Sequence, residues 1–189
     1  MGPADDLLSR LRGDLHAHTT WSDGRASLAE MAAAAEDLGR EYLAVTDHSP
    51  RLRVANGLSR ERLRAQWDEI ERVQAERDVR ILRGIEVDIL GDGSLDQADD
   101  LLSRLDVVVA SVHSDLNGPA EVLTARMVGA VSNPHTTVLG HCTGRRRRED
   151  GTWRAPSRFD AEVVFAACDV RRRRRDQLPT RALRPARRA

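Results

Sequence analysis

The sequence predicts an α/β fold in which parallel strands alternate with helices, as in a parallel sheet or a (β/α) barrel. Five short apolar runs alternate with segments of helical periodicity between residues 13 and 168. Each apolar run leads into a histidine or a carboxylate. In parallel β/α folds the carboxyl ends of the strands form the edge at which active sites are built, so these side chains are expected to meet there.

The first strand and helix carry the clearest local signals. The run GDLHA at 13–17 predicts a strand, and residues 27–39 predict a helix. Ser27 can cap that helix, with Glu30 at the capping-box position and Gly39 as a stop signal. The first β-α unit is therefore expected to span 13–39.

The later elements repeat these patterns. Residues 41–48 form a near-continuous apolar run typical of a buried parallel strand, and residues 59–77 place apolar side chains on one helical stripe. The chain is expected to continue with strands at 79–89, 106–113 and 136–141 and with helices at 94–105, 119–132 and from 157 to 168.

Length and composition indicate one globular domain. The 189 residues are 40% hydrophobic and 32% charged, and no apolar run is long enough to cross a membrane. The first residues lack the apolar segment of a secretory signal, and the two cysteines form no CxxC motif, which favours a cytoplasmic protein without a membrane partner. We expect a leader at 1–12, the domain at 13–168 and an arginine-rich tail at 169–189.

The placement of the histidines indicates a metal site. Five of the six lie where predicted strands end, and only His135 lies in a loop before a strand. His16 and His18 are two residues apart and so share a strand face. One buried histidine is more often a hydrogen-bonded core residue, but imidazoles gathered with carboxylates and without thiolates suit zinc, manganese or iron. The ligands are too many for one ion, and sites with several ions favour phosphoester hydrolysis.

Five motifs in order resemble those of the PHP (polymerase and histidinol phosphatase) family: DLHAHTTWSDG, TDHS, GIEVDI, SVHS and VLGHCTGR. The loop SPRLRVANGLS is similar to the PHP domain of bacterial family X DNA polymerases and its standalone relatives. The resemblance implies a distorted seven-stranded (β/α) barrel, here incomplete, with two or three divalent zinc, manganese or iron ions. It implies as substrate a phosphorylated small molecule, such as histidinol phosphate, or a DNA 3′ end. The implied metal ligands are His16, His18, Asp23, His48, Glu86, His113 and His141.

Other polar residues near this site have open roles. Asp23 could simply shape its turn, and the resemblance favours a ligand. Asp47 could hold the N–H of a metal-bound imidazole, or make a plain strand-end hydrogen bond. Arg51 and Arg53, after the second strand, and Arg145, after the fifth, could hold a substrate phosphate, with solvated loop charges as the alternative.

The end of the sequence departs from the family pattern. The family carries an Asp-x-His pair on its last strand, and no such pair follows His141. Residues 170–189 instead hold nine arginines and one acidic residue. A shifted reading frame, a basic arm that binds nucleic acid and a solvated tail are the three interpretations, and the abrupt break favours the first.

The missing pair bears on activity. We expect a metal-dependent phosphoesterase, that is, a hydrolase, whose catalysis is weak or absent because the Asp-x-His ligands are lacking. The alternative function is a catalytically inactive module that binds nucleic acid through the arginine-rich tail.

Overall fold

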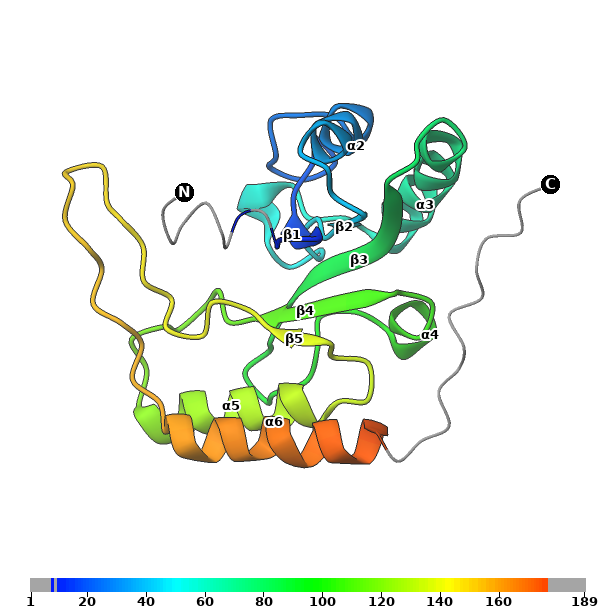
Figure 1. Cartoon of the computed structure of the whole chain (residues 1–189). Helices are drawn as coiled ribbons and strands as arrows, with labels where there is room; N and C mark the ends of the chain where they lie inside the picture. Colours follow the sequence, from blue (N-terminus) through cyan, green and yellow to red (C-terminus); the bar gives the residue numbers. More distant parts are fainter. Residues whose placement is uncertain (1–7, 9, 177–189) are drawn as a thin grey trace.

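Five parallel strands form a single sheet that curls into a half-barrel (Figure 1). The computed structural model describes residue 8 and residues 10–176, with side chains to residue 171. Each strand pairs with the next one in sequence, as in a barrel. The strands are β1 (Gly13–Ala17), β2 (Tyr42–Val45), β3 (Arg80–Asp88), β4 (Val107–Ser111) and β5 (Val138–Leu139). The predicted fold class, an incomplete α/β barrel, is confirmed.

Helices connect the strands and cover the sheet. In Figure 1, α2 and α3 lie above the sheet and α5 and α6 lie together below it. The helices are α2 (Leu28–Asp37), α3 (Arg60–Gln74), α4 (Asp99–Leu102), α5 (Ala120–Ser132) and α6 (Ala161–Asp176), with a 3-10 turn, η1 (Arg53–Ala55), after β2. The predicted capping box of α2 is present: Ser27 and Glu30 bond to each other's backbone N–H.

Two helices differ from their expected lengths. Helix α4 is only four residues long because the chain before it makes a turn, in which Ser94 donates to Asp92 and Leu95 bridges Ile89. Helix α6 continues to Asp176, so the expected boundary at 168 falls inside it. Residues 1–7 and 9 of the expected leader, and 177–189 of the expected tail, lie outside the described residues.

The main core lies between the sheet and its helices. Leu63, Ile85, Leu101, Leu123 and Met127 are all at most 1% exposed. Burial of this apolar surface holds the helices against the sheet.

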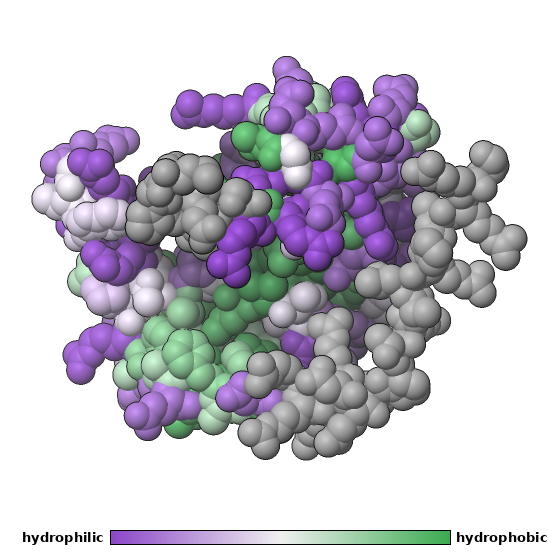
Figure 2. All heavy atoms as spheres, viewed as in Figure 1, coloured by the Kyte–Doolittle hydropathy of each residue, from purple (hydrophilic) through white to green (hydrophobic). Residues whose placement is uncertain are grey.

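A smaller apolar cluster is formed by Ala44, Val107 and Val109, with Leu82 and Val138 packed against it. Figure 2 shows apolar side chains along the middle of the viewed face and over the lower helices. Among the helices of the described chain, none has the length and apolar character needed to span a membrane.

Candidate metal centre

One buried carboxylate, Glu86 of β3, stands at the centre of five imidazoles. Its side chain is 1% exposed. Its Oε2 atom lies 3.4 Å from Nε2 of His16, 3.4 Å from Nε2 of His18 and 3.0 Å from Nδ1 of His48. Its Oε1 atom lies 3.2 Å from Nε2 of His113 and 2.8 Å from Nε2 of His141. All five strands thus deliver a side chain to one point.

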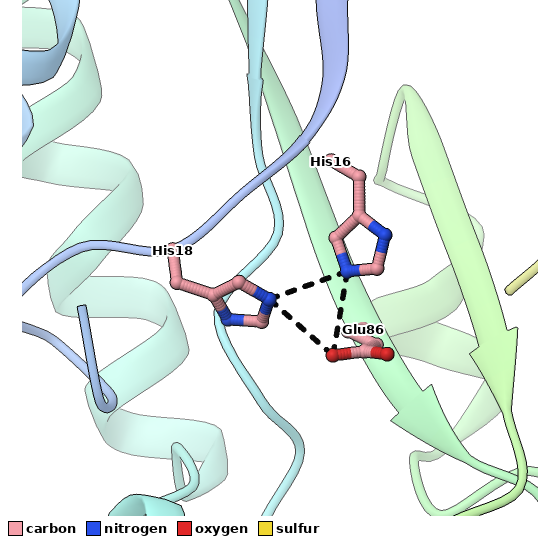
Figure 3. A group of neighbouring side chains, drawn as sticks. All are labelled: His16, His18 and Glu86. Carbon is pink, nitrogen blue, oxygen red and sulfur yellow. Dashed lines mark hydrogen bonds and ion pairs between the residues drawn. The ribbon is translucent and has the colours of Figure 1, made fainter. Parts of the chain in front are cut away.

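The strand ends produce this convergence. His16 lies on β1 and His18 just beyond it, and their Nε2 atoms are 3.2 Å apart. Figure 3 shows both rings turned toward Glu86. The pairing of β1 with β2 is irregular between Asp14 and Ala17, and such irregularities commonly re-aim side chains beside active sites. His48 reaches Glu86 through an isolated parallel bridge beyond the end of β2.

A tight loop brings Asp23 back over the histidines. Gly24 permits the close approach, because a Cβ atom there would lie 2.5 Å from the backbone of His18. Oδ1 of Asp23 then lies 3.6 Å from Nδ1 of His18 and 3.6 Å from Nε2 of His48. The seven residues proposed as ligands are therefore brought together, although His141 and Asp23 are about half exposed.

The spacing between Asp23 and His18 fits a shared metal ion better than a hydrogen bond. Nδ1 of His18 is buried and has no hydrogen-bond partner in the described part of the chain. Its 3.6 Å separation from Asp23 is too long for a hydrogen bond. Two metal–ligand bonds of about 2.1 Å at a tetrahedral angle separate their ligand atoms by about 3.4 Å. The nearby donors form three groups that could each hold an ion: His16, His18 and Glu86; His18, Asp23 and His48; and His48, Glu86 and His113.

The electrostatics keep the central carboxylate ionised. Burial alone would raise the pKa of Glu86, but hydrogen bonds with His113, His141 and His16 outweigh it and hold this pKa well below its usual range. Burial lowers the pKa of His48, which favours the neutral imidazole that a metal needs. Burial likewise opposes protonation of His113, but hydrogen bonds to Asp88 and Glu86 raise its pKa to about 9. A metal ion bound at His113 would have to displace that proton.

Asp47 does not have the expected imidazole partner among the described residues. Its buried carboxylate accepts hydrogen bonds from backbone N–H and hydroxyl groups of both Thr19 and Ser22 and from the side-chain amide of Gln66. Successive side chains of an extended chain point to opposite sides, so Asp47 faces α3 when His48 faces Glu86. Asp47 therefore anchors the loop that carries Asp23.

The carboxylate that does hold an imidazole is Asp88. It lies two residues after Glu86, is 5% exposed, and its Oδ1 is 2.5 Å from Nδ1 of His113. This contact directs Nε2 of His113 toward Glu86. The sequence alone does not identify this partner, because only the pairing of β3 with β4 brings Asp88 beside His113.

A cavity of about 480 Å³ opens beside the centre. Arg145 lines it, as do Arg146 and Arg154. The other lining residues are Asp23, Leu52, Val54, Ala55, Val112, His113, Leu116, His141 and Gly144. Arg51 and Arg53 are exposed and are not among the residues that line this cavity. Sequence reasoning missed Arg146 and Arg154, whose approach depends on how the chain folds after β5.

Comparisons with known proteins agree with this geometry. The PHP domain matches residues 14–139. The chain is 50% identical over 139 residues to "DNA polymerase/3'-5' exonuclease PolX" of Bacillus subtilis (strain 168), which covers 73% of this chain and 24% of that protein. It is 33% identical over 135 residues to a "Probable phosphatase" of Thermoanaerobacter sp. (strain X514), which covers 68% of this chain and 52% of that protein.

These matches cover most of the described domain but only part of each relative. The chain spans about a quarter of the polymerase and about half of the phosphatase. The region matched to the PHP domain runs from the second residue of β1 to the end of β5. It includes every candidate ligand except His141, which lies two residues beyond it. The chain belongs to the PHP domain family.

Proposed function

We propose that this chain is a metal-dependent phosphoesterase. The observation that carries the proposal is the convergence of five imidazoles on one buried carboxylate at the carboxyl ends of parallel strands. The relatives support this function, since one is named a 3'-5' exonuclease and another a probable phosphatase. The substrate class is a phosphomonoester or a DNA 3′ end.

We assign the metal-binding role to the seven clustered residues and propose two or three zinc, manganese or iron ions. Bound divalent ions at such a site polarise phosphoryl oxygens and lower the pKa of water. The ligands are His16, His18, Asp23, His48, Glu86, His113 and His141.

The remaining residues position and attract the substrate. Asp88 orients the imidazole of His113, and Asp47 holds the loop of Asp23 in place. Arg145 lines the cavity, where its guanidinium can bind phosphate oxygens by charge-assisted hydrogen bonds. For Arg51 and Arg53 the phosphate-binding role stays a prediction.

The test combines metal binding with hydrolysis. Replacing both His16 and His18 with alanine should weaken the binding of Mn²⁺ in calorimetric titrations. It should also abolish the weak hydrolysis of p-nitrophenyl phosphate and of a 3′-labelled oligonucleotide that is expected of a chain without the Asp-x-His pair. The matched control is His135→Ala, because His135 lies in the loop before β5 and outside the cluster. Hydrolysis retained by the double variant, or lost equally by the control, would reject the proposal.

A further inference from the structure

The chain between β5 and α6 forms a hairpin that carries consecutive arginines past the metal centre. Arg154 donates its backbone N–H to Arg146, and Arg147 forms an antiparallel bridge with Trp153. The turn is closed by Gly151, whose φ of 81° favours glycine. Figure 1 shows this segment extending away from the sheet.

The four arginines at 145–148 are exposed, and the described residues offer them no acidic partner. None of them forms an ion pair within the described chain. Adjacent like charges repel one another, so such a cluster is stabilised when an anion binds to it. Glu149 and Asp150 lie in the turn that the backbone hydrogen bond from Gly151 to Arg148 closes, so the run of positive charges ends at Arg148.

Two hollows connect the hairpin to the metal centre. The first is the cavity lined by His113 and His141, and the second, of about 540 Å³, lies along the hairpin. Arg146 and Arg154 line both hollows, and Arg148, Glu149 and Asp150 complete the lining of the second, where arginines outnumber acidic residues by three to two. A small phosphomonoester would fill only the first hollow, which Arg145, Arg146 and Arg154 line, whereas Arg148 would contact only a longer polyanion.

An aromatic side chain accompanies these charges. Trp153 is 57% exposed, and the guanidinium carbon of Arg145 lies 5.1 Å from the centroid of its ring. Proteins that bind single strands combine a positive groove along the phosphates with aromatic rings on which bases stack. The hairpin contains both components.

We propose that this hairpin binds the phosphates of a single-stranded nucleic acid whose terminal phosphoester enters the metal centre. The hairpin thereby selects a strand over a free phosphomonoester. This inference rests on the proposed phosphoesterase function, which it narrows to one substrate class.

The test measures binding separately from hydrolysis. A fluorescein-labelled oligothymidylate is titrated by anisotropy without added metal and at several salt concentrations. Replacing Arg146, Arg147 and Arg148 with glutamine should weaken binding and reduce the slope of log affinity against log salt by about 2, because each phosphate contact in a single strand contributes about 0.7. Trp153→Ala should weaken binding about tenfold through lost stacking.

The control removes the same charge elsewhere. Arg64, Arg72 and Arg80 are exposed on α3 and at the start of β3, and replacing them with glutamine should leave the salt slope near that of the parent chain. The proposal would be overturned if both triple variants lost the same affinity for the oligothymidylate, or if the hairpin variant lost none. If the parent chain binds through the hairpin but hydrolyses neither substrate, the phosphoesterase function fails while strand binding stands.

Discussion

Asp47 is a buried carboxylate that holds the loop after β1 in place. Five hydrogen bonds converge on its carboxylate from two residues of the loop after β1 and from Gln66 of α3. Hydrogen bonds to an ionised acceptor are stronger than neutral ones, and each donor left unpaired in the interior is costly. The position of Asp23 over His18 therefore depends on a carboxylate that touches neither residue.

Replacing Asp47 with alanine should lower the free energy of unfolding by about 3 kcal/mol or more, because buried donors of Thr19, Ser22 and Gln66 lose their acceptor. Urea denaturation measures this loss. The matched control is Asp37→Ala at the exposed end of α2, which should change stability by less than about 0.5 kcal/mol. If Asp47→Ala and Asp37→Ala unfold at similar urea concentrations, the loop is held by contacts other than those of Asp47.

Most residues that meet at the site could be predicted from the sequence, because the direction of parallel strands determines which side chains lie at the same edge of the sheet. Apolar runs such as those before His48 and His113 mark buried parallel strands, and parallel strands place their carboxyl ends at one edge. Which neighbour a carboxylate meets across that edge depends on register and on packing against helices. For that reason the sequence left two roles open for Asp47, and the contact with an imidazole is made by Asp88 instead.

Helix α5 ties the ends of β3 and β4 together through Arg126. The side chain of Arg126 is buried, at 2% exposure, and has no carboxylate partner in the described chain. It donates hydrogen bonds to the carbonyl oxygens of Ile89, Leu90 and Ser114. Ile89 follows Asp88, and Ser114 follows His113, so this guanidinium fixes the two loops whose side chains pair at the centre.

Replacing Arg126 with methionine should weaken the binding of Mn²⁺ about tenfold or more in calorimetric titrations, because the contact between Asp88 and His113 loses its support. The control is Met127→Ala on the same helix, which removes core packing and should cost about 2–5 kcal/mol of stability. This control should bind Mn²⁺ nearly as well as the parent chain at a temperature where both are folded. If Arg126→Met and Met127→Ala lose the same affinity for Mn²⁺, then α5 contributes only to the stability of the fold.

The sequence predicted whether each element is a strand or a helix better than it predicted how long the element is. Apolar periodicity identified every strand, and the capping residues of α2 were correct. The strand expected at 136–141 is reduced to Val138–Leu139 because it pairs only with Val109 and Ala110 of β4. Helix α4 is shortened by a turn whose hydrogen bonds to Asp92 compete with helix formation.

The curled sheet has two edges in the described chain, at β1 and β5. Apolar side chains are also exposed on α6, where Val163 is 48% and Phe165 54% exposed. Open edges and exposed apolar surface favour association between chains, so we expect modest stability and a tendency to aggregate. The candidate metal centre bears directly on this stability, because its proposed ligands come from the ends of all five strands.

Metal ions bound at this centre would cross-link the half-barrel. A ligand that binds only the folded chain stabilises it by about 2.7 kcal/mol at a hundredfold excess over its dissociation constant. For a domain of this size, that corresponds to a rise of about 5–10 °C in Tm. Adding Mn²⁺ or Zn²⁺ to chelator-treated protein should produce this shift in calorimetric scans, and EDTA should reverse it.

Glu86→Gln should remove the shift in Tm, because Glu86 contacts all five imidazoles, whereas His135→Ala should retain it. A Tm that does not respond to metal in the parent chain would show that the clustered side chains do not act as a metal centre.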